Sequence, residues 1–170
     1  MYGTVHQLDD RRWQLRFTRS LPHPQSKVWR AITEPEHLAR WFPTTIEGER
    51  AAGAPLRFAF PGGQAPPMDG EMLAYEPESA MELQWGTDVV RIELRQVPAG
   101  TELTLLDTFE EHGKAARDGA GWHTCLDALE AALDGGSDAR AKTDRWAEVH
   151  THYIDSFGPE AATIGPPAQT

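Results

Sequence analysis

Residues Lys114 to Gly136 read KAARDGAGWHTCLDALEAALDGG, and no other stretch of the chain has so clear a period. Its apolar residues recur at steps of three and four, which places one set on a single helix face: Trp122, Cys125, Leu126, Leu129, Ala132 and Leu133. Gly135-Gly136 ends the helix, because glycine takes the left-handed conformation that follows a helix without a Cβ clash. Such a helix needs a large apolar surface, which a curved antiparallel sheet would supply.

The residues before this helix alternate between apolar and polar over short segments, as strands do. Strands are expected at Trp13–Phe17, Thr44–Gly48, Leu56–Phe60, Gly70–Tyr75, Met81–Trp85, Val90–Leu94 and Glu102–Phe109. Two short helices are predicted after the first strand, one ending near Ile32 and one with Pro35 in its first turn. The Pro- and Gly-rich run 61–67 is expected to be a loop. The predicted fold class is therefore α+β, with an antiparallel meander and one long helix.

The composition divides the chain into three parts. Residues 1–11 are polar and expected to be flexible, residues 12–136 form the domain, and residues 137–170 form an extension with a disordered end. A short amphipathic helix is predicted near 144–157, with Trp146, Val149, Tyr153 and Phe157 on one face. This face needs to be covered, either by the chain's own domain or by a second copy in a homodimer.

The 170 residues carry a net charge of −10, which argues against nucleic acid or an anionic membrane as a partner. No apolar run is long enough for a membrane span or a signal peptide, so a cytoplasmic protein is expected. The single cysteine, Cys125, lies on the apolar helix face and is expected to be buried and inert.

Several short motifs occur in an order and spacing known from one superfamily. They are Phe17-Thr18-Arg19, Val28-Trp29-Arg30-Ala31-Ile32-Thr33, Leu38-Ala39-Arg40-Trp41-Phe42, Leu83-Gln84-Trp85 and Gly121-Trp122. Over roughly residues 12–136 the chain resembles the START-like superfamily, also called SRPBCC. Within this superfamily, the chain resembles the branch that is named after the C-terminal domain of the activator of heat-shock protein 90 ATPase. The resemblance implies a helix-grip (START-like, Bet v-like) fold, in which six or seven strands wrap around the long helix and enclose an apolar cavity.

The resemblance also implies which residues border that cavity. We expect its wall to include Trp41, Phe42, Phe58, Phe60, Met72, Trp85, Asp107, Phe109, Trp122, Cys125 and Leu126. For each aromatic residue the alternative is ordinary core packing. The ligand is expected between Trp122 and the strand that carries Asp107, because the apolar stripe of the helix weakens there to glycine and alanine.

Asp107 is the candidate catalytic residue. By alternation it points inward with Leu103 and Leu105, where a carboxylate must be paired, hydrogen-bonded or wetted by a cavity. Desolvation would raise its pKa and suit it to act as an acid or a base. The alternative is that a bulge, or the strand end near Phe109, turns Asp107 to solvent.

Other polar groups have simpler interpretations. Arg91 and Arg95 are expected to form a solvated charge ladder with Glu93 rather than an anion clamp. His123 is expected to be partly exposed or hydrogen-bonded. His150 and His152 fall on different sides of a helix, and no cysteine or carboxylate cluster accompanies them, so the sequence predicts no metal and no cofactor.

Gly119 and Gly121 are costly inside a helix. Either the regular helix begins after Gly119, or the backbone is bent and closely packed there, which could make it a hinge for the cavity mouth.

These observations favour a protein that binds an apolar or amphipathic small molecule in an internal cavity, and favour it over an enzyme. Two alternatives stay open. One is an enzyme of the polyketide cyclase type that uses Asp107 for proton transfer. The other is an interaction module associated with a chaperone, which the resemblance suggests.

Overall fold

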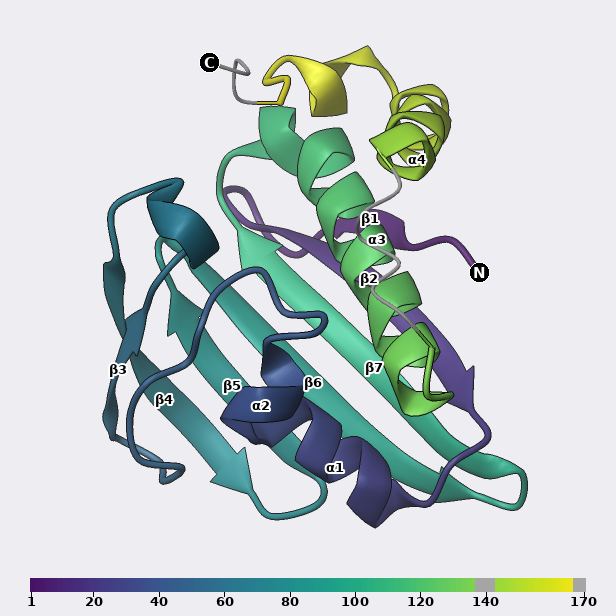
Figure 1. Cartoon of the computed structure of the whole chain (residues 1–170). Helices are drawn as coiled ribbons and strands as arrows, with labels where there is room; N and C mark the ends of the chain where they lie inside the picture. The colour runs from purple at the N-terminus through teal and green to yellow at the C-terminus, as the bar shows by residue number, and fades with distance from the viewer. Residues whose placement is uncertain (137–142, 167–170) are drawn as a thin grey trace.

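One antiparallel sheet of seven strands organises the computed structural model, which describes residues 1–136 and 143–166. The strand order is β1-β2-β7-β6-β5-β4-β3. The strands are β1 (Thr4–Gln7), β2 (Trp13–Leu21), β3 (Pro55–Phe58), β4 (Met68–Glu76), β5 (Ala80–Trp85), β6 (Asp88–Val97) and β7 (Gly100–Phe109). The long helix α3 (Ala115–Leu133) lies across one face of the sheet, as Figure 1 shows. The predicted α+β helix-grip arrangement is confirmed.

Two shorter helices, α1 (Gln25–Thr33) and α2 (Pro35–Leu38), lie in front of the same sheet face beside α3 (Figure 1). Single 3-10 turns occur at η1 (Pro61–Gly63), η2 (His112–Lys114) and η4 (Pro159–Ala162). The helix α4 (Thr143–Phe157) follows α3. Among the described residues, no helix combines the length and the apolar character needed to cross a bilayer.

The main core lies between α3 and the concave side of the sheet. Leu126 and Leu129 of α3 are buried, as are the inward residues Leu103 and Leu105 of β7. The α3 helix begins at Ala115, so Gly119 and Gly121 both lie inside it. A Cβ on Gly119 would come within 3.3 Å of Phe157 and 3.4 Å of Tyr153, both on α4. Close packing of α4, rather than a late helix start, therefore explains this glycine.

Two expectations about local structure were wrong. Residues 1–11 are not flexible throughout, because Thr4–Gln7 forms β1 along the edge of the sheet, with Val5 opposite Leu15. The segment expected as a strand at Thr44–Gly48 makes only an isolated bridge, between Glu47 and Arg57. Backbone pairing here consists of the two hydrogen bonds between Glu47 and Arg57 and one from the Thr45 N–H to the Ala59 carbonyl at 2.8 Å. The carbonyl oxygens of Ile46 and Gly48 instead accept from the Arg50 side chain at 3.0 and 3.1 Å.

The extension packs on its own domain. Val149 and Tyr153 of α4 are fully buried, and Ala161 in η4 is buried too. The Tyr153 hydroxyl accepts a hydrogen bond from the Gly3 backbone N–H at 2.7 Å. The apolar face of α4 is thus covered within the chain. Part of the predicted disordered end, residues 167–170, lies outside the described residues, as does the linker 137–142.

Candidate functional site

Asp107 lies at the centre of the polar part of the core, on β7. Its exposed fraction is 0%, so the alternation with Leu103 and Leu105 holds and no bulge turns it to solvent. Its Oδ2 atom accepts a hydrogen bond of 2.8 Å from the indole N–H of Trp122 on α3. Its Oδ1 atom has no hydrogen-bond partner among the described residues.

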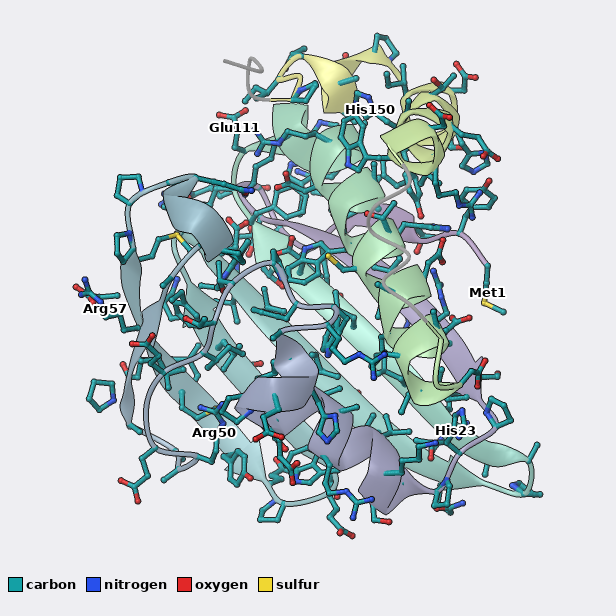
Figure 2. All side chains as sticks on the ribbon, viewed as in Figure 1. Met1, His23, Arg50, Arg57, Glu111 and His150 are labelled. Atoms are coloured by element: carbon teal, nitrogen blue, oxygen red, sulfur yellow. The ribbon has the colours of Figure 1, made fainter. Side chains whose placement is uncertain are left out.

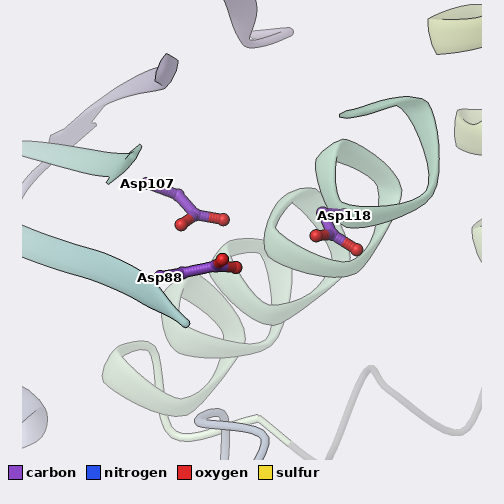
Figure 3. Close-up of side chains that lie close together, drawn as sticks. All are labelled: Asp88, Asp107 and Asp118. Atoms are coloured by element: carbon purple, nitrogen blue, oxygen red, sulfur yellow. The ribbon is translucent and has the colours of Figure 1, made fainter. Parts of the chain in front are cut away.

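Two further aspartates converge on Asp107, as Figure 3 shows. Asp88 begins the neighbouring strand β6, and Asp118 lies in the first turn of α3. One carboxylate oxygen from each of the three residues lies within 4.8 Å of the others. The Lys114 ammonium donates to Asp88 and lies 3.2 Å from Asp118 Oδ2. We call Asp88, Asp107, Asp118 and Lys114 the acidic cluster.

The acidic cluster shifts the proton affinities of its members. Burial raises the pKa of Asp107 to about 8, and the nearby charge of Asp88 adds to the shift, while the Trp122 hydrogen bond opposes it. Burial also raises the pKa of Asp88, although Lys114 works against this. For Lys114, burial lowers the pKa, but the charges of Asp118 and Asp88 outweigh it and the net shift is upward. At neutral pH, Asp107 therefore carries a proton.

Aromatic side chains cover the acidic cluster. The ring centroid of Trp122 lies 5.6 Å from that of Phe42 and 5.5 Å from that of Trp85. The Trp85 indole N–H donates to Thr44 Oγ1 at 3.2 Å. Because Trp122 bonds directly to Asp107, the space in which the sequence placed a ligand is closed by that contact.

A cavity of about 950 Å³ lies instead beside α1 and α2, bordered by the segment that follows α2 and by β4. Its apolar wall includes Trp29, Pro35, Phe42, Ile46, Pro61 and Tyr75. The polar wall is formed by Arg30, Thr33, Glu34, Thr44, Thr45, Glu47 and Arg50. Figure 2 places Arg50 beside these two helices. We call this space the α1–α2 cavity.

Arg50 shapes one end of the α1–α2 cavity. Its guanidinium donates to the Thr33 carbonyl at 2.9 and 3.0 Å, and also to the carbonyls of Ile46 and Gly48. These bonds join the last turn of α1 to the loop opposite. Burial lowers the pKa of Arg50, which the Tyr75 hydroxyl partly counters.

Of the eleven residues expected to line a cavity, Phe42 borders the α1–α2 cavity. Trp41, Phe58, Met72, Phe109, Trp122, Cys125 and Leu126 are buried in the core, while Phe60 and Trp85 are half-buried. Sequence reasoning missed Trp29 and Tyr75, whose rings lie 5.5 Å apart across the cavity wall. In the sequence, Trp29 belongs to a predicted helix and Tyr75 ends a predicted strand, and neither position indicates a cavity.

The remaining candidates have structural partners. Arg91 pairs with Glu93 at 2.6 Å and Arg95 with Glu102 at 2.8 Å, which confirms the charge ladder. His123 is buried and its Nδ1 lies 2.9 Å from the Tyr153 hydroxyl. Burial lowers the pKa of His123 to about 4, so it is neutral at physiological pH.

Comparison with known proteins supports the fold described above. A family model described as Activator of Hsp90 ATPase homolog 1-like protein matches residues 22–134. A conserved protein of unknown function from Enterococcus faecalis, EF2215, superposes with a TM-score of 0.76 at 20% identity, covering 91% of this chain and 90% of that chain. CalU16 from Micromonospora echinospora gives 0.68 at 22% identity, covering 91% and 93%.

A third solved structure, DynU16 from the dynemicin biosynthetic locus, is 27% identical with a TM-score of 0.66. The match covers 75% of this chain and 49% of that chain. No curated protein matches this chain.

Proposed function

Because the chain belongs to the family of Activator of Hsp90 ATPase homolog 1-like proteins, we propose that it binds an apolar or amphipathic small molecule in the α1–α2 cavity. The observation that carries this proposal is the cavity itself. Its volume of about 950 Å³ lies at the upper end of the range, roughly 300–1,000 Å³, typical of small-molecule sites.

The wall of the α1–α2 cavity suits such a ligand. Trp29 and Tyr75 contribute neighbouring aromatic rings to the lining, and Phe42 and Ile46 contribute further apolar surface. Arg50 supplies a cation held in place by three backbone carbonyls, so it costs little additional side-chain entropy to use it. An apolar body with one polar group therefore fits the wall best.

Native mass spectrometry of the purified protein, followed by titration with the fluorescent amphiphile anilinonaphthalene sulfonate, tests the proposal. Ala39 is exposed and borders the cavity, so Ala39→Trp fills it without disturbing the core. We expect this variant to lose the bound mass and to bind the probe at least about tenfold more weakly, because a filled pocket excludes the ligand.

Ala147→Trp is the matched control, because Ala147 is an exposed helical alanine on α4 that does not border the cavity. It should bind as the unaltered protein does. Equal binding by both variants would place the ligand elsewhere and reject this cavity as the site.

A second function, catalysis of the polyketide cyclase type, is favoured by one observation. Burial raises the pKa of Asp107 to about 8, and its partner Trp122 packs against Phe42, which borders the α1–α2 cavity. A ligand that displaced these rings would meet a carboxylic acid able to donate a proton near neutral pH. The biosynthetic locus of DynU16 accords with such a role.

Simple binding and catalysis predict different outcomes for the molecule that an Asp107→Asn variant carries. If the protein is an enzyme, the variant should retain a substrate whose mass differs from that of the molecule held by the unaltered protein. If it only binds, both proteins should carry the same molecule. Either result comes from one comparison by native mass spectrometry.

A further inference from the structure

The acidic cluster has the composition and size of a cation site. We propose that Asp88, Asp107 and Asp118 together bind a hard divalent cation of the magnesium or calcium class. This site is separate from the α1–α2 cavity, and its proposal does not rest on the ligand-binding function.

The first argument is geometric. Two oxygens on opposite sides of a cation bound at about 2.4 Å lie about 4.8 Å apart. The three carboxylate oxygens of the cluster lie within 4.8 Å of one another, so a point between them is at most about 2.8 Å from all three, close to the distance at which Ca²⁺ binds oxygen. A set made only of carboxylate oxygens suits Mg²⁺, Ca²⁺ or Mn²⁺ rather than the softer metals that prefer sulfur or imidazole.

The second argument is the unpaired oxygen of Asp107. This residue is fully buried, and its Oδ1 atom has no hydrogen-bond partner among the described residues. A buried carboxyl oxygen without a partner is costly and calls for a bound ion or water. Figure 3 shows the Asp107 carboxyl directed toward Asp88 and Asp118, where a cation would satisfy it.

The Lys114 ammonium already provides a positive charge within the acidic cluster. It contacts Asp88 and Asp118 but makes no hydrogen bond to Asp107 in the described residues. With all groups ionised, three carboxylates and one ammonium leave a net charge of −2, so the cluster still attracts a cation while Lys114 is in place. Lys114 therefore acts as an internal competitor, and the ion enters as the ammonium moves aside toward solvent.

Terbium luminescence reports directly on this site. Tb³⁺ follows the ligand chemistry of Ca²⁺ and emits when a nearby indole transfers excitation to it. Trp122 bonds to Asp107, so an ion in the cluster would lie next to an indole. We expect saturable emission, removed by competing Ca²⁺ or Mg²⁺, with a Kd for Ca²⁺ of about 10⁻⁵ to 10⁻³ M. Whichever competitor acts at lower concentration identifies the preferred ion.

Three variants make the test specific. Asp107→Asn should weaken Tb³⁺ binding at least about tenfold, because a charged ligand is lost, and Asp118→Asn should do the same from a less buried position. Lys114→Met should tighten binding by about tenfold, because it removes the competing ammonium. Asp155→Asn on the exposed side of α4 controls for adsorption of the ion to an acidic surface and should change nothing.

A further readout is independent of luminescence. Ca²⁺ must displace the proton that Asp107 carries, so calorimetry at pH 7 in buffers of different ionisation enthalpy should show release of about one proton per ion. Binding that survives both Asp107→Asn and Asp118→Asn, or that is unchanged by Lys114→Met, would overturn the proposal. So would the absence of saturable binding below about 10⁻³ M.

Discussion

At the scale of single residues, Asp107 is the group in the described chain whose protonation departs furthest from that of its isolated side chain. The cause is local, because its burial is complete and Asp88 is a second acid on the adjacent strand. Trp122 stabilises the charged form with one hydrogen bond, but one bond does not offset desolvation. Stability and pH are therefore linked through this residue.

The direction of this pH dependence follows from the pKa of Asp107 in the unfolded chain and in the folded protein. In the unfolded chain Asp107 loses its proton near pH 3.8, whereas in the folded protein it does so near pH 8. Between these values the folded state holds one proton more, so the free energy of unfolding falls as pH rises, by on the order of 1 kcal/mol per pH unit. The contribution of Asp107 to stability is fully present below its unfolded-state pKa of 3.8 and is lost as the pH rises through its folded-state pKa of about 8.

Asp107→Asn should remove this slope, because the amide is neutral at every pH and can still accept from Trp122. Urea unfolding at pH 5, 6.5 and 8 would measure it. The difference in stability between variant and unaltered protein should shift in favour of the variant as pH rises. A constant difference would show that Asp107 ionises normally.

Alternation along β7 suffices to predict that Asp107 faces inward, because strand periodicity is a local property. The partners of Asp107 are not local. Asp88 reaches it through the pairing of β6 with β7, and Asp118 through the way α3 lies on the sheet. No spacing in the sequence encodes these approaches, so the cluster was missed and the sequence predicted no metal ligands.

At the scale of elements, the contact between α3 and α4 depends on a residue with no side chain. Gly119 faces Tyr153 and Phe157, whereas a Cβ on Gly121 would meet nothing within 4 Å. The two glycines lie in the same helix, two residues apart. Substitutions at the two positions therefore separate the effect of helix propensity from the effect of packing.

Gly121→Ala should raise the free energy of unfolding by about 0.5–1 kcal/mol, because alanine loses less backbone entropy than glycine in a helix. Gly119→Ala should gain less, since its methyl group crowds α4, and Gly119→Leu should cost about 1–3 kcal/mol by overpacking. Thermal and urea unfolding would compare all three. Equal stabilisation by the two alanine variants would show that α4 does not pack as described.

The packing of α3 also explains why the space expected beneath its N-terminal half is filled. The sequence placed the ligand cavity there, where the apolar stripe thins. In the structure Trp122 fills that space with its ring and its bond to Asp107. The α1–α2 cavity lies where Arg50 binds the carbonyls of Thr33 and Ile46, and an arginine side chain that caps carbonyls leaves no periodic signal in the sequence.

At the scale of the whole molecule, the extension joins segments from opposite ends of the chain. Tyr153 on α4 bonds to Gly3 before β1 and lies within hydrogen-bond distance of His123 on α3. Burial raises the pKa of Tyr153 to about 12, so its hydroxyl stays protonated. Tyr153 thus connects the edge of the sheet to the C-terminal helix, and the stacking of Tyr2 on His152 adds a second contact.

Tyr153→Phe keeps the ring that packs on Gly119 and Phe17 but removes the hydroxyl, leaving the Gly3 N–H without its acceptor. The expected cost is about 1–3 kcal/mol, since a buried donor loses its partner. Hydrogen exchange should show faster opening of β1 amides, while the central strands β6 and β7 keep their protection. Tyr75→Phe is the control, because the Tyr75 hydroxyl makes no hydrogen bond within the described residues. If β1 exchanged equally in both variants, Tyr153 would not be what holds the N-terminus to the domain.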